Sequence, residues 1–169
     1  RYYNAVDFIF DRQWDGKWLF HGSYTWSKSY GNNEGSVRSD NGQDDAGLTT
    51  LFDQPGLLDG AFGNLPNDRR HQVKMFGAYG ITDELTVSAN FSWESGRPKN
   101  AFGYHPTDVF AQAYGSESFY SFGQLSPRGS QGRTPSTWTL DLGVQWEPRI
   151  FDDYKLKVRA DVFNVFNND

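Results

Sequence analysis

The sequence predicts an all-β fold, a segment of an antiparallel transmembrane β-barrel, and three observations lead to this prediction. Six stretches alternate apolar and polar residues with period two, which sends successive side chains to opposite faces of a β-strand. The connections between these stretches are alternately short and long. Tryptophan occurs at both ends of several apolar faces, where membrane barrels carry aromatic girdles.

The final hairpin shows the strand pattern most clearly. Its first arm, residues 137–146, has a face made of Trp138, Leu140, Leu142, Val144 and Trp146. In its second arm, residues 154–162, apolar residues alternate with Lys155, Lys157, Arg159 and Asp161. About eight residue steps of roughly 3.3 Å, tilted by about 40°, rise about 20 Å, close to the ~25 Å apolar band of a membrane barrel.

Four further strands are predicted at residues 2–11, 17–28, 70–80 and 85–94. Asp15-Gly16 gives a hairpin signal between the first two, and residues 82–83 make a tight turn between the next two. The first strand places Val6, Phe8 and Phe10 on one face. Six strands cannot close a barrel, because about eight is the smallest bacterial size. The rest of the barrel is therefore expected outside this sequence.

Two long stretches, at about residues 31–68 and 95–136, have no sustained period and are predicted as loops. They alternate with short turns at residues 12–16, 82–83 and 147–153. Outer-membrane barrels have short periplasmic turns and long outer loops. A structureless loop of ~20 or more residues argues against a compact soluble domain. We therefore predict two long extracellular loops.

Composition excludes several classes of protein. The 169 residues include 17% aromatic residues and no cysteine, and the formal net charge of −5 gives no basis for nucleic-acid binding. No run approaches the ~18 apolar residues of a membrane helix, but hydropathy cannot detect strands that are apolar on one face only. The sequence opens within a strand pattern and shows no signal peptide, so we expect a fragment of a longer exported chain.

Four motifs accompany the strand pattern: YTWSKSYGN at 24–32, LPNDRRH at 65–71, SGRP at 95–98 and DVFNVFN at 161–167. Together they resemble the C-terminal barrel region of TonB-dependent outer-membrane receptors. The stretches at 40–47 and 52–56 are most similar to the Oar-like, OmpA-related group of these receptors. The motif at 161–167 resembles the penultimate strand of such receptors, so the family's last strand would follow Asp169.

The resemblance implies a 22-stranded barrel in the cell outer membrane of a Gram-negative bacterium. It also implies an N-terminal plug and a TonB box outside this sequence, and transport of an unidentified substrate. Expected partners are outer-membrane lipid, lipopolysaccharide, the protein's own plug and TonB. The rival functions are a passive porin-like or adhesin-like barrel and a soluble β-sandwich binding module. A sandwich also alternates its residues but does not explain the long strands or the alternating connections.

The charged face of the final hairpin is the first candidate site. Asp141, Lys155, Lys157, Arg159 and Asp161 cannot face lipid, where Arg or Lys costs roughly 2–4 kcal/mol near the midplane, so we expect them in the lumen. They either contact the plug and the permeation path or form a hydrated wall, and both interpretations remain open. If Trp146 lies opposite Tyr154, Asp141 lies opposite Arg159, and this is the predicted register.

The long loops hold further candidates. Asp40, Asp44 and Asp45 offer oxygen ligands that Ca²⁺ prefers, although a hydrated acidic loop is the favoured interpretation. Arg69 and Arg70 mark the barrel rim or bind an anion such as a lipopolysaccharide phosphate. The second loop holds many aromatic residues, which bind a ligand or fold the loop. Those assigned to ligand contact are Tyr104, Tyr114 and Tyr120.

A lipid-facing aromatic girdle is predicted from the ends of the strands. Its members are Trp18, Trp26, Trp93, Trp138, Trp146 and Tyr154. No catalytic residue is predicted, because the three histidines are scattered, cysteine is absent and no serine lies in a nucleophile motif. We expect no enzyme activity and no firm metal or cofactor.

Overall fold

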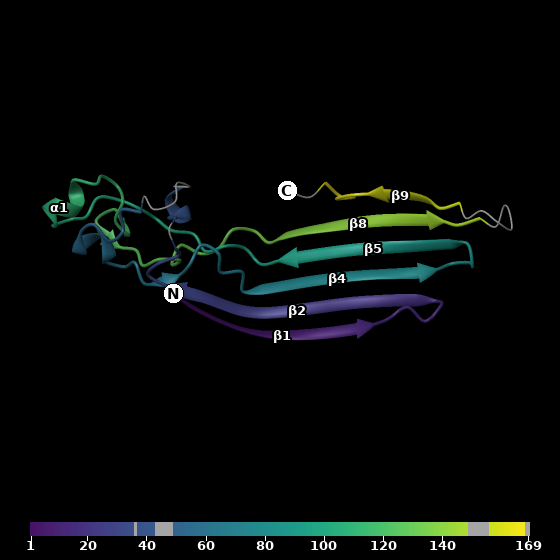
Figure 1. The fold of residues 1–169 in the computed structure, drawn as a ribbon. Coiled ribbons are helices and arrows are strands. Elements are labelled where there is room, and N and C mark those ends of the chain that lie inside the picture. Colours follow the sequence, from purple (N-terminus) through teal and green to yellow (C-terminus); the bar gives the residue numbers. More distant parts are fainter. Residues whose placement is uncertain (36, 43–48, 149–155, 168–169) are drawn as a thin grey trace. The chain divides into compact units, whose positions relative to one another are not determined.

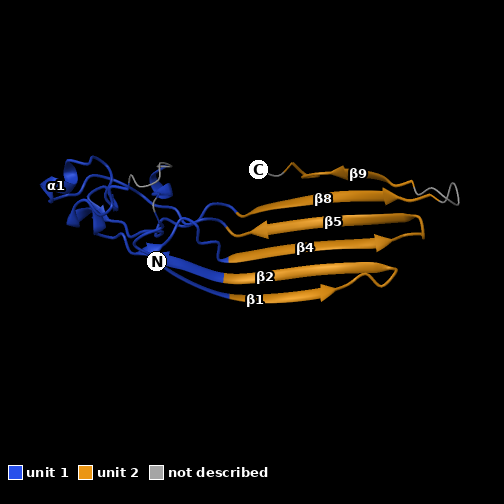
Figure 2. Cartoon of the chain, in the orientation of Figure 1, with its two compact units in different colours: residues 1–5, 27–70, 96–135 blue, residues 6–26, 71–95, 136–169 orange. Residues whose placement is uncertain are grey.

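The computed structural model describes residues 1–35, 37–42, 49–148 and 156–167 and divides the chain into two compact units (Figure 2). Unit 1 comprises Arg1–Ala5, Ser27–Arg70 and Gly96–Pro135. Unit 2 comprises Val6–Trp26, His71–Ser95 and Ser136–Asp169. Unit 2 contains the long strands except for residues 2–5 and 27–31, which belong to unit 1 together with most of the two predicted loops.

Six long strands form an antiparallel sheet in the order β1-β2-β4-β5-β8-β9 (Figure 1). The strands are β1 Tyr2–Arg12, β2 Trp18–Gly31, β4 His71–Gly80, β5 Leu85–Glu94, β8 Thr137–Trp146 and β9 Val158–Val162. Strand β3, Gly63–Asn64, pairs with the end of β2 within unit 1. Within the described residues the sheet is not closed, because β1 and β9 each pair with one neighbour only. The predicted all-β antiparallel architecture is confirmed.

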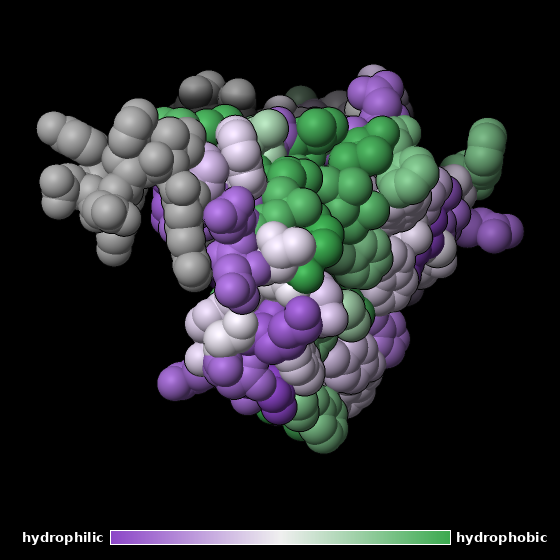
Figure 3. Space-filling view, turned by 90° about the vertical axis from the view of Figure 1, so that its right-hand side faces the viewer, coloured by the Kyte–Doolittle hydropathy of each residue, from purple (hydrophilic) through white to green (hydrophobic). Residues whose placement is uncertain are grey.

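Each strand alternates its faces as the period-two pattern predicted. One row across the sheet consists of the cross-strand partners Phe20, Gly77, Ala89, Leu142 and Val162. A row on the opposite face consists of Ser23, Lys74, Ser92 and Thr139. We call these the apolar face and the polar face. Seen from the end with the short turns, hydrophobic residues gather in one patch flanked by hydrophilic residues (Figure 3).

The predicted register of the final hairpin is wrong. Trp146 lies opposite Val158 rather than Tyr154, and Arg159 lies opposite Gln145 rather than Asp141. The connection between the two arms is longer than the sequence indicated, because strand β9 begins only at Val158. Beyond β9, the Val165 N–H donates to the Leu140 carbonyl at 2.9 Å, one residue out of step with the ladder, in which Asn164 would face Leu140. The displacement is even in residues, so every side chain keeps its predicted face.

Unit 1 has more structure than two irregular loops. It contains the short helices η1 Ser39–Asn41, η2 Pro55–Leu58 and α1 Val109–Gln112, and a hairpin of β6 Tyr120–Ser121 and β7 Gln124–Leu125. The fully buried hydrophobic side chains of the described residues all lie in this unit: Leu51, Leu57, Ala61, Leu65, Ala111 and Phe119. Both loops contribute to this small core. Among the described residues, no helix has the length and apolar character needed to cross a membrane.

Candidate functional site

The polar face of unit 2 carries the charged residues predicted for the lumen. The Asp141 carboxylate accepts hydrogen bonds from the Asn90 side chain at 3.1 Å and from the Asn164 backbone at 2.9 Å. Arg159 donates through Nε to both carboxylate oxygens of Asp161, at 3.0 and 2.8 Å. These three residues therefore share one face, but the acid–base pair forms along β9 instead of between the strands.

Lys157 also forms an ion pair, because its Nζ lies 2.8 Å from Glu147 at the start of the connection. Both side chains are about half exposed, so the pair contributes little, about 0–1 kcal/mol. Lys155 lies outside the described residues. On this hairpin Lys157 and Arg159 are each paired with a carboxylate, and the Asp141 carboxylate accepts amide hydrogen bonds, which suits a hydrated wall.

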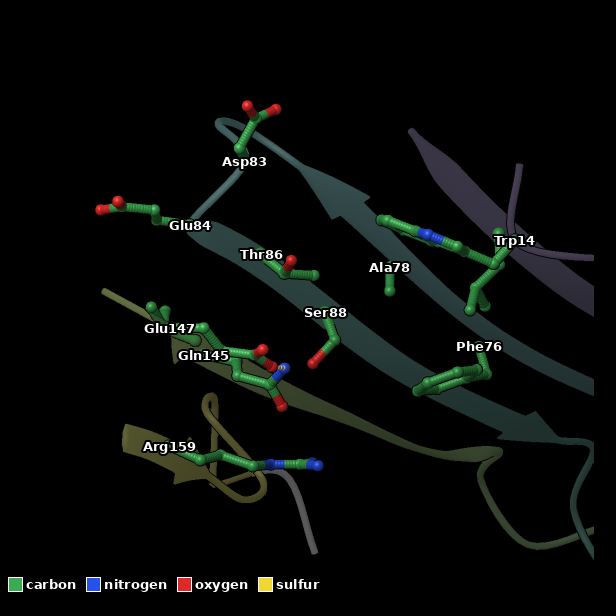
Figure 4. A pocket seen from close by; sticks show the side chains of 12 residues that line it. Trp14, Phe76, Ala78, Asp83, Glu84, Thr86, Ser88, Gln145, Glu147 and Arg159 are labelled. Atoms are coloured by element: carbon green, nitrogen blue, oxygen red, sulfur yellow. Dashed lines mark hydrogen bonds between the residues drawn. The ribbon is translucent and has the colours of Figure 1, made fainter. Parts of the chain in front are cut away.

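A hollow of about 430 Å³ opens on the polar face near the short turns (Figure 4). Trp14, Phe76 and Ala78 line one side, together with Leu19. The other side is polar and carries Thr86, Ser88, Gln145, Arg159, Asp83, Glu84 and Glu147, with Val144. Trp14 and Phe76 were not predicted here, because Trp14 lies in a turn and the alternating pattern indicates polar side chains on this face around Phe76. The hollow can receive a group with both apolar and hydrogen-bonding parts.

Toward the long loops, the polar face carries hydroxyl groups that form hydrogen bonds with one another and with carboxylates. Ser92 and Thr139 are joined by a hydrogen bond of 2.7 Å between their hydroxyls. Thr137 donates to the Glu94 carboxylate at 3.3 Å, and Thr25 donates to Asp7 at 2.5 Å. A surface of hydroxyls and carboxylates is readily hydrated. None of these residues forms a nucleophile–base arrangement.

The buried carboxylate of Asp68, which was not among the predicted site residues, is the main polar centre of unit 1. It accepts a hydrogen bond from the Ser29 backbone at 2.6 Å, pairs with Arg70 at 3.1 Å and forms an ion pair with Arg133. Arg133 also donates to the carbonyls of Asp68 and Gly96, both at 2.8 Å. Burial acts to raise the pKa of Asp68, but these hydrogen bonds outweigh it and lower the pKa.

Asp68 belongs to the motif at 65–71, in which Arg69 and Arg70 were the predicted site residues. Arg70, a candidate for anion binding or for the rim, is committed to Asp68 in the structure. Arg69 is partly exposed, and its carbonyl accepts a hydrogen bond from the Ser27 hydroxyl at 2.9 Å. The motif therefore fastens the end of β2 to both loops within unit 1.

The predicted calcium ligand Asp40 belongs to a second buried cluster of ion pairs. Its side chain is only 1% exposed and lies 3.2 Å from Arg38 and 3.4 Å from Arg128. Arg38 also pairs with Glu117 of the other loop at 2.8 Å. Burial lowers the pKa of the Arg128 guanidinium, and the charge of Asp40 opposes this. Asp40 thus links the loops through arginines.

Metal binding finds no support in the described part of the chain. It contains no group of three or more His, Cys, Asp or Glu side chains placed to hold a metal ion. Asp44 and Asp45, the other predicted calcium ligands, lie outside the described residues.

The aromatic residues of the second loop divide into two sets. Phe102 and Phe119 pack together, with ring centroids 5.0 Å apart, and fold the loop. Tyr120 meets the His105 ring edge-on at 4.8 Å, and burial together with Asp59 raises the pKa of Tyr120. Tyr104 is exposed and Tyr114 is half-buried. Of the three tyrosines predicted to contact a ligand, only Tyr104 is therefore fully available to one.

The predicted girdle residues lie on the apolar face. At the end toward the loops, Trp93 lies directly opposite Trp138, and Trp26 lies opposite His71. At the end with the short turns, Trp18 lies opposite Tyr79, and Trp146 lies between Leu85 and Val158. Tyr154 lies outside the described residues. Aromatic side chains thus mark both ends of the apolar face.

Comparison with known proteins gives one informative match. No protein-family model matches the chain, and no solved structure matches it. The chain is 38% identical over 171 residues to the TonB-dependent transporter Oar of Myxococcus xanthus. The match covers 99% of this chain but only 15% of that protein. The resemblance drawn from the motifs is confirmed, because the chain is similar over almost its whole length to a piece of an Oar-type TonB-dependent transporter.

Proposed function

We propose that this chain forms part of the barrel of an outer-membrane TonB-dependent transporter, which moves an unidentified substrate across that membrane. One observation carries the proposal. The sheet of unit 2 has a continuous apolar face, with aromatic side chains at both ends, opposite a face of paired charges and hydroxyls. Large apolar side chains on this face, such as Leu142, Val144 and Val162, stay exposed. A bilayer on one side and an aqueous lumen on the other satisfy both faces.

The relative adds the expected surroundings. Oar is named as a TonB-dependent transporter, and this chain spans about 15% of its length. We infer that further strands complete the barrel, to 22 by family resemblance, and that a plug occupies the lumen. The two-sided hollow beside Phe76 and Arg159 supports contact with such a plug, because it offers both apolar and hydrogen-bonding surface. Substrate and TonB are then partners of the whole protein.

The topology proposed for the membrane follows from connection lengths. The turn between β1 and β2 and the turn between β4 and β5 lie at one end of the strands, the end where β8 finishes and β9 begins (Figure 1). The two long connections leave from the other end. Because outer-membrane barrels have short turns on the periplasmic side, unit 1 is assigned to the cell exterior.

Cysteine labelling in intact cells tests this topology. This chain contains no cysteine, so new ones can be introduced within it. Phe122→Cys, at a fully exposed position of unit 1, is expected to react with a membrane-impermeant maleimide on intact cells. Gln13→Cys, exposed in a short turn, is expected to react only after the outer membrane is permeabilised. The reverse pattern contradicts the orientation, and labelling of both sites in a soluble fraction contradicts the membrane assignment.

Energy coupling is tested on the complete protein. If the complete protein is a TonB-dependent transporter, it is expected to bind the purified periplasmic part of TonB after incubation with a cell extract that contains its substrate. A complete protein without a plug, or without TonB binding, would instead be a passive barrel or an adhesin. That result would remove the transport proposal while leaving the two-faced sheet in the membrane.

A further inference from the structure

We propose a phospholipid site on the apolar face of unit 2, in which one acyl chain lies in a groove and the lipid phosphate meets Arg12 and Lys17. The inference rests on the proposed function, because the apolar face must contact a bilayer. It goes further by assigning one place on that face to one lipid class. The ligand is an anionic phospholipid of the leaflet nearer the short turns.

The groove has a volume of about 490 Å³ and is lined almost wholly by apolar side chains. Two small residues form its floor: Gly77 of β4 and Ala89 of β5, which are direct cross-strand partners. Larger residues form its walls: Trp18, Phe20, Met75, Tyr79, Phe91 and Leu142. Small residues set between aromatic ones leave a depression that an extended hydrocarbon chain can fill. Dispersion contacts there exceed those of a smooth surface.

Two cations stand at one end of this groove. The Arg12 guanidinium carbon lies 4.0 Å from the centroid of the Trp18 ring, and the Lys17 Nζ lies 4.8 Å from that of Tyr79. Trp18 and Tyr79 are direct cross-strand partners, and both line the groove. The two charges are therefore held side by side, above the rings where the hydrocarbon layer would end.

The turn between β1 and β2 fixes the position of these cations. Asp15 forms an ion pair with Arg12, and its other carboxylate oxygen accepts hydrogen bonds from the backbones of Lys17 and Trp18 at 3.0 and 3.1 Å. Two cations and one carboxylate leave a net charge of +1. An arginine fork and a lysine ammonium are the usual ligands of a phosphate.

Charge also favours a lipid over a second copy of the chain. The apolar-face positions of the paired strands β2, β4, β5, β8 and β9 include no carboxylate within the described residues. Two apolar faces in contact would bury the groove but would bring no anion to Arg12 and Lys17. A phospholipid supplies both parts, since its phosphate and its chains are covalently joined.

The test measures phosphatidylglycerol retained by the complete transporter after detergent washing, by native mass spectrometry. The double variant Arg12→Gln/Lys17→Gln removes the cations. Its matched control is Lys28→Gln, whose Nζ lies 4.7 Å from the centroid of the Tyr30 ring; neither of these residues lines the groove. The variant Ala89→Leu fills the floor. Its control is Ala160→Leu, on the same face but outside the groove lining.

We expect the double variant and Ala89→Leu each to weaken retention of phosphatidylglycerol about tenfold, equivalent to about 1.4 kcal/mol, and both controls to match the wild type. Phosphatidylcholine is expected to be retained less well than phosphatidylglycerol by the wild type and by both controls, whereas the double variant should retain the two lipids equally. Equal retention by all variants, or a dimer in place of bound lipid, overturns the site. Either result can occur with the protein still in the outer-membrane fraction, whereas recovery as a soluble protein would refute the proposed function itself.

Discussion

The substitution Leu142→Arg probes the apolar face at its most sensitive point. Leu142 lies in the middle of β8, between Trp138 and Trp146, and its cross-strand partners are Ala89 and Val162. Its side chain is 43% exposed in the described sheet, so its outer part would contact lipid. An arginine on the lipid face of a membrane barrel costs roughly 2–4 kcal/mol at the midplane. The folding equilibrium constant should therefore fall about 30- to 900-fold.

Asn90→Arg is the matched control. Asn90 is exposed on the polar face and pairs with Asp141, one step along the strand from the pair Ala89 and Leu142. Its amide already donates to the Asp141 carboxylate at 3.1 Å. An arginine there gains an acid partner, worth about 0.2–1 kcal/mol as a cross-strand pair. The same new charge at nearly the same depth is therefore expected to be tolerated.

The assay compares the complete proteins in lipid vesicles by urea titration, with heat-modifiable migration on gels as the readout of a folded barrel. Leu142→Arg should unfold at a clearly lower urea concentration or fail to assemble, while Asn90→Arg should match the wild type. Equal destabilisation by both substitutions would mean that the two faces of the sheet contact the same solvent. A larger effect of Asn90→Arg would mean that the faces are assigned the wrong way round.

Three further predictions concern unit 1. Asp68→Asn should destabilise unit 1 by roughly 1–3 kcal/mol, since Arg133 loses a buried charged partner. Because folding lowers the pKa of Asp68, the stability that this carboxylate contributes is present above its unfolded pKa of about 3.9 and is lost as the pH falls below that value. A proteolysis series from pH 7 to pH 3 should show this loss in the wild type and not in the variant. Phe122→Asn should raise the free energy of unfolding by about 0.4–1 kcal/mol, because Phe122 is fully exposed and its φ of 50° lies in the left-handed region, which asparagine adopts more readily. A lower free energy of unfolding would show that the ring has a structural role. Gly96→Ala should prevent unit 1 from folding, because a Cβ would lie 1.6 Å from the Thr134 carbonyl oxygen, and wild-type protease resistance would contradict this packing.

The sequence predicted the sheet well because strands leave a local pattern. The ranges of β5 and β8 coincide with the predicted ones, since each strand alternates without interruption between clear turn signals. The register of the last hairpin depended on the length of its connection, which the alternation does not encode. Faces survived the error because an even displacement preserves them.

The two loops could not be predicted in the same way, because their order comes from contacts between distant residues. Asp68 meets Arg133, and Arg38 meets Glu117, each pair joining one loop to the other. Isolated charged residues carry no periodic signal of such pairing. The cations over the aromatic rings at Trp18 and Tyr79 were hidden for the same reason. Only the paired strands bring them to one place.

Solvent accessibility along β8 tests the central claim most directly. Single cysteines at residues 139–145 of the complete transporter in lipid vesicles would carry a spin label, and collisions with oxygen and with a water-soluble nickel complex would be measured. We expect oxygen accessibility to peak at Leu140, Leu142 and Val144, with minima at Thr139, Asp141 and Gln145. Accessibility to nickel at Leu142 equal to that at Asp141, or oxygen peaks at the polar positions, would contradict a strand with lipid on one side and a lumen on the other.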